Sequence, residues 1–225
     1  MIKKIIIILL IITALVAGVC IFFYIRSFHT LSITFSSGVS SVVVKKGETA
    51  IKEMSENGTV SLQDGNYSII PKGEKVSSTA IPLTIKGEDE ALTVDPDYSE
   101  AYLQTILESE SATVTAAIKN KYPNIDTTFV IGKGTLYKKG EWYATTLTQI
   151  VENSNDTSDV YRVVLKKEGN GWVIKTTPEI VLSLSKYPEV PESVINSTNN
   201  LTGTGTVYRN SRATIDNDYY TVPLE

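Results

Sequence analysis

Cysteine and histidine are nearly absent from this chain of 225 residues, which has one of each, Cys20 and His29. A single cysteine cannot form an internal disulfide, so the body of the protein depends on hydrophobic burial, for which about 200 residues are enough. A single histidine, next to an N-terminal apolar segment, excludes Ser-His-Asp and Cys-His catalytic arrangements and histidine-rich zinc sites in the body. Because small eukaryotic extracellular domains usually contain disulfides, their absence favours a bacterial surface protein.

An excess of positive charge is also missing. The sequence contains 21 Lys and Arg against 25 Asp and Glu, for a net charge of −4, and the two signs are interspersed. Proteins that bind nucleic acid usually display a basic stripe, so we set nucleic acid aside as a partner. A mildly acidic surface of mixed charge is typical of a soluble exported domain.

The longest apolar run covers residues 5–25, between Lys3-Lys4 and Arg26. As a helix this run would rise about 31 Å, close to the thickness of a bilayer's hydrocarbon core. The run continues where a signal peptide would have its cleavage site, so we predict an uncleaved transmembrane anchor. The positive charge before the run places residues 1–4 in the cytoplasm and the body outside. The predicted location is therefore the cell membrane, with a single pass.

Cys20 offers one alternative to this anchor, a lipoprotein signal. Such signals need a small residue immediately before the cysteine, whereas Val19 is branched and the apolar run continues beyond Cys20. A membrane-buried thiol that behaves as a small apolar side chain is the favoured interpretation.

Residues 31–95 contain the period-2 alternation of half-buried strands, as in Leu31 and Ile33. Turn signals recur between the apolar segments, and Asn57-Gly58 is the strongest hairpin signal among them. Short strands at this spacing predict a small β-sandwich over residues 31–95.

The segment 62–71 contains Gly65 and Tyr67 in a Gly-x-Tyr pattern, followed by apolar residues. It resembles the corresponding strand of PEGA-like and other transthyretin-like sandwich modules. In these families the glycine allows the turn and the tyrosine packs at the corner of the sandwich. The resemblance implies a spacer, a structural element or an adhesion surface.

From residue 97 the apolar period changes from 2 to 3.6, which predicts a helix over residues 99–121. Asp97 or Ser99 can cap this helix, and Pro123 ends it. Its apolar stripe consists of Leu103, Ile106, Leu107, Val114, Ala117 and Ile118. Four strand signals follow, over residues 127–137, 141–151, 159–167 and 172–176. We therefore predict a separate α+β unit over residues 97–190.

One long helix followed by four antiparallel strands resembles the NTF2-like, or cystatin-like, α+β fold, in which the sheet curls around the helix. The turns before Trp142 and Trp172 are similar to hairpins of such domains in bacterial membrane-anchored proteins. The resemblance is one of topology and includes no catalytic motif. From Asn196 the composition is polar, so we predict a flexible tail over residues 196–225.

Two short motifs suggest ligands at first sight. Asp95-Pro-Asp97-Tyr-Ser99 has the alternating oxygens of a calcium loop. Such a loop needs glycine at its sixth position and a carboxylate at its twelfth, where this chain has Glu100 and Ile106. Helix capping is therefore the favoured role of these residues, and no metal site is predicted. Gly132-Lys-Gly134-Thr lacks the spacing of a phosphate-binding loop and interrupts a strand, where a bulge or bend is the usual meaning.

Aromatic side chains are the remaining candidates for a binding site. If the sheet curls over the helix, some of them line its concave face, where core packing and a ligand pocket are both possible, and core packing is favoured. The candidates are Tyr102, Tyr137, Trp142, Tyr143 and Tyr161.

These features favour a membrane-anchored, extracytoplasmic binding or spacing protein without catalytic residues or cofactors. Its expected partners are the membrane, through residues 5–25, and a surface protein, peptide or cell-wall polymer. The alternative is an NTF2-like small-molecule receptor or a carboxylate-based hydrolase at the cell surface. A concave cavity with two facing carboxylates would favour that alternative.

Overall fold

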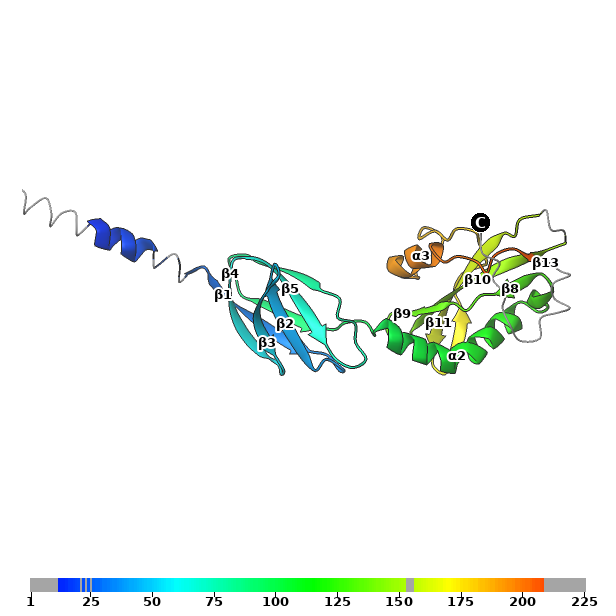
Figure 1. The fold of residues 1–225 in the computed structure, drawn as a ribbon, viewed down its shortest axis with the longest axis horizontal. Helices are drawn as coiled ribbons and strands as arrows, with labels where there is room; N and C mark the ends of the chain where they lie inside the picture. Colours follow the sequence, from blue (N-terminus) through cyan, green and yellow to red (C-terminus); the bar gives the residue numbers. More distant parts are fainter. Residues whose placement is uncertain (1–11, 21, 23, 25, 153–155, 209–225) are drawn as a thin grey trace, which may run out of the picture. The chain divides into compact units, whose positions relative to one another are not determined.

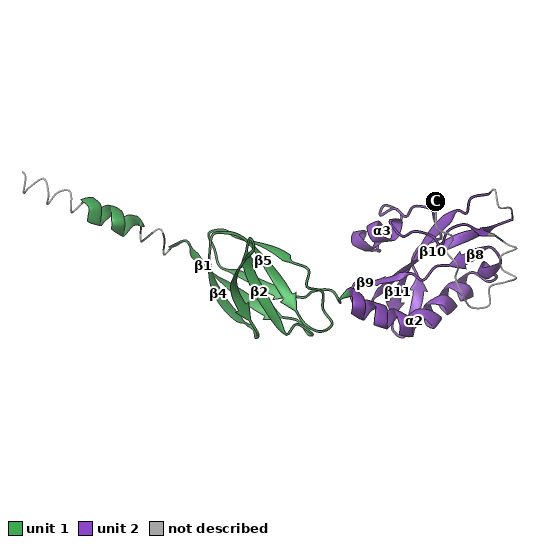
Figure 2. Cartoon of the chain, in the orientation of Figure 1, with its two compact units in different colours: residues 1–99 green, residues 100–225 purple. Residues whose placement is uncertain are grey.

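The computed structural model describes residues 12–20, 22, 24, 26–152 and 156–208. The chain divides into two compact units, residues 1–99 and residues 100–225 (Figure 2). Each unit has its own hydrophobic core and is described by itself.

The predicted anchor at residues 5–25 falls mostly outside the described residues, as does the predicted cytoplasmic segment 1–4. Positions 12–20 are helical. Within the part of the chain that the structure describes, no helix is both long enough and apolar enough to cross a membrane. The anchor therefore stays a prediction from the sequence.

The first unit is a sandwich of two β-sheets (Figure 1). The smaller sheet has the order β4-β1-β7 and the larger has the order β3-β2-β5-β6. Neighbouring strands are antiparallel except for β1 and β7, which are parallel. The strands are β1 (Phe28–Phe35), β2 (Ser41–Lys46), β3 (Thr49–Met54), β4 (Gly58–Gln63), β5 (Gly65–Lys72), β6 (Ile81–Ile85) and β7 (Glu90–Val94).

Alternating apolar residues of both sheets form the core of this sandwich. Leu31 and Ile33 of β1 are buried, and so are Val42 and Val44 of β2 and Ile69 of β5. Successive side chains of a strand point to opposite faces, so the period-2 pattern places one apolar row between the sheets. The predicted layered β architecture of this region is confirmed.

The Gly-x-Tyr pattern lies at the start of β5. Gly65 has a φ of 151°, which glycine adopts far more readily than other residues. The buried Tyr67 donates a hydrogen bond of 2.8 Å from its Oη to the Gln63 carbonyl. The pair therefore fixes the β4–β5 corner.

The second unit has one long helix, α2 (Glu100–Lys121), and a six-stranded sheet within the described residues. The order along the sheet is β12-β11-β10-β13, and both β8 and β9 also pair with β10. The helix is followed by the 3₁₀ turn η1 (Ile125–Thr127), and the strands are β8 (Phe129–Ile131), β9 (Thr135–Tyr137), β10 (Trp142–Val151), β11 (Val160–Glu168), β12 (Gly171–Ile174) and β13 (Val207–Tyr208).

The sequence predicted the long helix and the four strand segments that follow it, and the structure confirms these elements. The first segment is divided into β8 and β9 by a bend at Gly132 and Gly134. A Cβ atom on Gly132 would lie 2.5 Å from Oγ1 of Thr146, and one on Gly134 would lie 2.3 Å from Oη of Tyr143. Both positions therefore require glycine. The four predicted strand segments are present. The bend divides the first of them into β8 and β9, and β13 is an additional strand, so six strands pair in the described sheet.

Two helices cover the two faces of the sheet (Figure 1). On one face the buried Leu107, Val114 and Ile118 of α2 pack with sheet residues that include Leu147 and Leu165. On the other face lies a second helix, α3 (Glu192–Asn199). Its apolar residues pack with Ala144, Val164 and Leu182.

The predicted flexible tail is wrong for residues 196–208. Residues 196–199 complete α3, and Val207 and Tyr208 form β13, which pairs with β10. The composition is polar, but Val194, Ile195 and Thr198 share one buried helix face. Residues 209–225 of the predicted tail lie outside the described residues.

Candidate functional site

The five aromatic candidates do not converge on one surface. Trp142 and Tyr143 follow each other on β10, so their side chains point to opposite faces of the sheet. Trp142, 5% exposed, packs with α3, whereas Tyr143, 3% exposed, packs with α2. Tyr137 contacts the α3 side, and Tyr161 contacts the α2 side.

Hydrogen bonds and ring contacts fix several of these side chains in the interior. Tyr143 donates from Oη to the Lys133 carbonyl over 3.1 Å, and burial raises the pKa of its hydroxyl. Tyr161 packs edge-to-face on Phe129, with 5.4 Å between the ring centroids. Tyr102 is half-buried on α2. The structure thus distributes the predicted set over both sides of the sheet.

A carboxylate that the sequence analysis did not single out links α2 to the sheet. Glu110 accepts hydrogen bonds from Lys167 and from Nε1 of Trp172, the latter over 2.9 Å. These bonds, with Lys167 the larger cause, lower the pKa of Glu110. Both carboxylate oxygens have partners, so Glu110 fastens the helix to β11 and β12.

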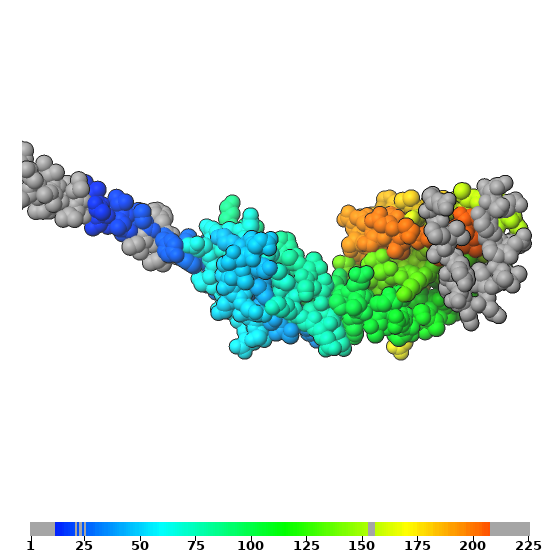
Figure 3. Space-filling model, viewed as in Figure 1, coloured from blue at the N-terminus to red at the C-terminus, as the bar shows by residue number. Residues whose placement is uncertain are grey.

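An exposed group of aliphatic side chains lies between β12 and α3. Ile180 is 51% exposed, Val181 is 65% exposed and Leu184 is 41% exposed. We call these three residues the apolar ridge. In the colour scale of Figure 3 the segment that contains it is yellow to amber, just before the orange surface of α3. Clustered apolar side chains at a surface are typical of a contact site.

Arg162 of β11 holds both ends of the segment that begins at the ridge and continues through α3. Its Nε donates to the Thr198 carbonyl over 3.1 Å, and its Nη2 donates to the Leu201 carbonyl over 2.9 Å. Its Nη1 donates to the carbonyls of Val160 and Ile180. One guanidinium group therefore ties the ridge and the end of α3 to the sheet.

Asn199 of α3 fixes the middle of the ridge segment. Its Oδ1 accepts the Leu182 N–H over 2.8 Å, and its Nδ2 donates to the Leu182 carbonyl over 2.9 Å. The Leu182 side chain is buried against the sheet. Ile180, Val181 and Leu184 thus flank an inward anchor and point outward from it.

Glu179 provides the third attachment. Its Oε1 accepts hydrogen bonds from Lys186, Tyr187 and Thr177. These bonds, with Lys186 the largest cause, lower the pKa of Glu179 to about 2. Its backbone also pairs with Arg162 in both directions, over 2.7 and 3.2 Å. The ridge is consequently exposed and held in place at the same time.

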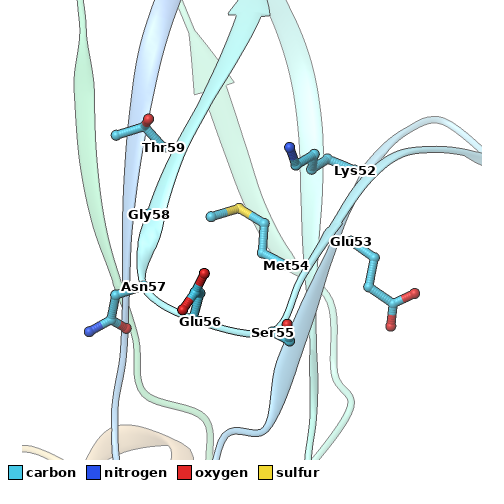
Figure 4. Close-up of a pocket in the computed structure, with 8 residues that line it drawn as sticks. All are labelled: Lys52, Glu53, Met54, Ser55, Glu56, Asn57, Gly58 and Thr59. Carbon is cyan, nitrogen blue, oxygen red and sulfur yellow. The ribbon is translucent and has the colours of Figure 1, made fainter.

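The first unit has a shallow depression of about 260 Å³ at the β3–β4 connection, lined by residues 52–59 (Figure 4). Met54 and Glu56 point into it, whereas Glu53 points away and pairs with Lys72 over 2.7 Å. Most of its lining side chains are exposed and polar. Ligand pockets are usually deeper and mainly apolar, so this depression is the weaker candidate.

Across the described ranges, no group of three or more His, Cys, Asp or Glu residues could hold a metal ion. The ridge itself offers aliphatic side chains at the surface and a backbone that is held at Ile180 and Leu182. Neither the exposure of these side chains nor the Arg162 hydrogen bonds could be read from the sequence. The one available signal was the run Ile-Val-Leu-Ser-Leu between Pro178 and Pro188.

Comparisons with known proteins provide no family for this chain. No protein-family model matches it, and no curated protein matches it. A solved structure of a DUF3823 family protein from Parabacteroides merdae is similar over 68% of this chain and 81% of that chain, with 10% identity and a TM-score of 0.23. A TM-score this low shows neither a shared fold nor a shared function.

Proposed function

We propose that this chain is a single-pass, membrane-anchored, extracytoplasmic protein that works by binding, without catalysis, and that a polypeptide partner docks on the apolar ridge. The proposal rests on one observation: the side chains of the ridge are exposed, while hydrogen bonds hold the ridge segment to the rest of the unit. Ile180, Val181 and Leu184 are exposed. Arg162 holds the Ile180 carbonyl, and Asn199 holds the backbone of Leu182, which lies between the ridge residues. A surface already held in its binding conformation loses less entropy when the partner arrives.

The size of the ridge favours a polypeptide segment over a second copy of the chain. A stable dimer buries roughly 800 Å² per partner, much more than three partly exposed aliphatic side chains provide. The side chains of the ridge also include no aromatic ring on which a sugar could stack. A few aliphatic contacts suit a short apolar segment of another protein.

The backbone of the ridge supports the same choice. Among the described residues, the N–H and C=O groups of Val181 make no hydrogen bond. An extended peptide can pair with such groups and place alternate side chains on the neighbouring apolar surface. Main-chain hydrogen bonds would supply affinity, and Ile180 and Leu184 would select aliphatic side chains.

The membrane anchor and the orientation of the body are part of this proposal. They are supported by the apolar run 5–25 and by the positive charge before it. Protease added to intact protoplasts should degrade the body of the full-length chain. Complete protection before lysis would contradict the proposed orientation.

The finer fold assignments also belong to this proposal. The Gly65–Tyr67 corner supports a PEGA-like or transthyretin-like first unit, and the long helix followed by antiparallel strands supports an NTF2-like second unit. The alternative of a small-molecule receptor or hydrolase has less support. Side chains packed with α2 and α3 occupy the two sheet faces on which an NTF2-like pocket would open.

Site-specific photocrosslinking in the protein's own cells tests the docking site. A photoreactive residue at Val181 of the full-length chain should crosslink to one protein, whereas the same residue at the exposed Ser193 on α3 should not. Adding Ile180→Lys and Leu184→Lys should abolish the crosslink. Because both side chains are exposed, these substitutions should change the free energy of unfolding by only about 0.5 kcal/mol.

Three outcomes would overturn the assignment of a polypeptide partner. They are crosslinks of the chain to itself, crosslinks to a polymer that glycan digestion removes, and equal crosslinks from Val181 and Ser193. Retention of the crosslink in the Ile180→Lys/Leu184→Lys variant would show that the ridge does not select the partner.

A further inference from the structure

The predicted anchor continues into the first strand of the sandwich almost without a break. Helical positions extend to Arg26, and β1 begins at Phe28. Ser27, between them, is hydrogen-bonded in both directions. Its N–H and its Oγ donate to the Tyr24 carbonyl over 3.2 and 2.7 Å, and its carbonyl accepts the Asp64 N–H over 3.2 Å. Hydrogen bonds therefore tie this connection to the helix on one side and to the β4–β5 turn on the other.

Phe28 is the one large apolar side chain at the outward positions of β1. Successive side chains of a strand point to opposite faces, and the buried Leu31 and Ile33 define the inward face. The outward positions of β1 are Phe28, Thr30, Ser32 and Thr34. On the paired strand β4 the exposed residues are Thr59 and Ser61. Large apolar surface on this pair of strands is therefore confined to the end at which the anchor joins.

Tyr24 lies against Phe28 at this end. Their rings pack edge-to-face with 5.3 Å between the centroids, and Tyr24 is 61% exposed and Phe28 39% exposed. We call these two residues the aromatic pair. Tyrosine is enriched at the level of lipid headgroups, and phenylalanine is common on protein surfaces that lie in the membrane interface. Two exposed rings in contact at the end of the apolar run 5–25 suit this environment.

The length of the connection places Phe28 at the headgroup level. If residues 5–25 span the hydrocarbon core, the headgroup layer beyond them is about 5–7 Å thick. The three steps from residue 25 to Phe28 advance about 5 Å if they are helical and about 10 Å if they are fully extended. The backbone of Phe28 is then inside the headgroup layer or at its outer boundary, and its ring is within reach of the lipid.

Two carboxylates brace the end of the sandwich that carries the aromatic pair. Oδ1 of Asp64 accepts the Gly87 N–H over 2.9 Å and lies 3.2 Å from Nε2 of His29. Oδ1 of Asp89 accepts the Thr30 N–H over 2.6 Å. The β4–β5 and β6–β7 turns are thus held against the start of β1, so this end of the first unit is one connected surface.

We propose that the aromatic pair lies in the lipid headgroup layer and docks this end of the first unit on the membrane surface. The inference rests on the membrane anchor of the proposed function. Lipid is the occupant because a bilayer that encloses residues 5–25 already lies beside Phe28, whereas another protein would have to enter the space between the sandwich and the bilayer. The two rings and the hydrogen bonds of Ser27 would hold the sandwich at a fixed height above the membrane.

Fluorescence quenching measures this height in the full-length chain, reconstituted in phosphatidylcholine nanodiscs with Cys20→Ser as the background. An environment-sensitive fluorophore is attached at Thr30→Cys or at Thr34→Cys, two outward positions that lie about 13 Å apart along β1. A nitroxide on the lipid headgroup should quench the label at residue 30 strongly and the label at residue 34 weakly. This comparison uses the natural Phe28, so it does not depend on how a Phe28 variant folds.

Variants of Phe28 then test the aromatic pair. Phe28→Ser should shift the balance between docked and undocked sandwich about fivefold towards the undocked state, because part of the burial of one phenylalanine is lost. Quenching at residue 30 should fall towards the value at residue 34. Phe28→Tyr keeps the ring and should keep the quenching. Ile51→Ser is the matched control, because Ile51 of β3 is 47% exposed on the other sheet, and quenching should not change.

Copurification with the nanodiscs separates a failure of the anchor from a failure of the docking. A chain that does not copurify would overturn the anchor and this inference together. If the chain copurifies but residues 30 and 34 are quenched equally, the docking proposal alone is wrong. It is also wrong if Phe28→Ser leaves the quenching unchanged, or if Ile51→Ser lowers it by the same amount. These measurements do not involve the apolar ridge, so they leave the proposal of a polypeptide partner intact.

Discussion

Replacing Arg162 with methionine should loosen α3 and the apolar ridge together. Methionine keeps much of the length of the side chain but removes every donor of the guanidinium group. The carbonyls of Thr198 and Leu201 would lose their bonds to Arg162, and so would those of Val160 and Ile180.

The expected magnitude follows from these four hydrogen bonds. A bond to a charged donor contributes about 1.5–3 kcal/mol, but Arg162 is half-buried and water can replace part of what is lost. We therefore expect Arg162→Met to lower the free energy of unfolding by about 2–4 kcal/mol. Arg162→Lys keeps the charge with fewer donors in a different geometry, so it should recover only part of this loss.

Tryptophan fluorescence during urea unfolding measures this effect in the full-length chain, because both tryptophans, Trp142 and Trp172, lie in the second unit. Hydrogen exchange should show faster exchange in α3 and around Leu182 than in α2. Lys121→Met, at an exposed position at the end of α2, is the matched control and should cost about 0.5 kcal/mol or less. If Arg162→Met costs no more than this control, the guanidinium group does not hold the segment.

Two further predictions test the packing of the C-terminal segment and the acid that supports the ridge. Gly203→Ala should lower the free energy of unfolding by about 1–3 kcal/mol, because its Cβ would lie 2.6 Å from Cγ2 of Val160. Gly171→Ala is the control and should cost little, because the nearest atom to its Cβ is 4.0 Å away. Equal urea midpoints for the two variants would contradict this prediction. The pKa of Glu179 is lowered from 4.5 to about 2, so its stabilising effect is complete above pH 4.5 and is lost as the pH falls towards 2. Glu179→Gln should therefore flatten the acid limb of the stability curve, and parallel curves would show that the carboxylate contributes nothing.

The long helix was predictable because its signal extends over many residues. The stripe that includes Leu107, Val114 and Ile118 recurs at a period of 3.6, and Pro123 marks the end. The strands of the sandwich were predictable for the same reason, at a period of 2. Signals of this kind depend only on neighbours in the sequence, so they can be recognised without knowledge of the tertiary structure.

The prediction of one aromatic surface did not take the alternation of side chains along a strand into account. Trp142 and Tyr143 are adjacent residues of one predicted strand, so alternation alone assigns them to opposite faces. Only one of the two could line a concave surface. The two cores observed on the two sides of β10 follow from this rule.

Other features of the second unit could not be predicted from local patterns. The helix α3 has a polar composition and few apolar residues, and its burial depends on the partners that β10 and β11 supply. The two-residue strand β13 pairs in parallel with the distant Ile150 and Val151. Arg162 binds backbone carbonyls. Because every residue has a carbonyl, the sequence does not indicate which residues Arg162 binds.

In the second unit, the side chains that hold the backbone of the ridge segment differ from those that form its exposed surface. Arg162, Asn199 and Glu179 hold the backbone of the ridge segment, whereas Ile180, Val181 and Leu184 provide the exposed surface. Substitutions in the first group should therefore reduce stability and binding together, while substitutions in the second should reduce binding alone. Because a rigid backbone lowers the entropy cost of docking, the proposed docking site requires the first group to act on affinity without touching the partner. In the proposed function, this separation would allow a contact surface of three aliphatic side chains to be specific even though it is small.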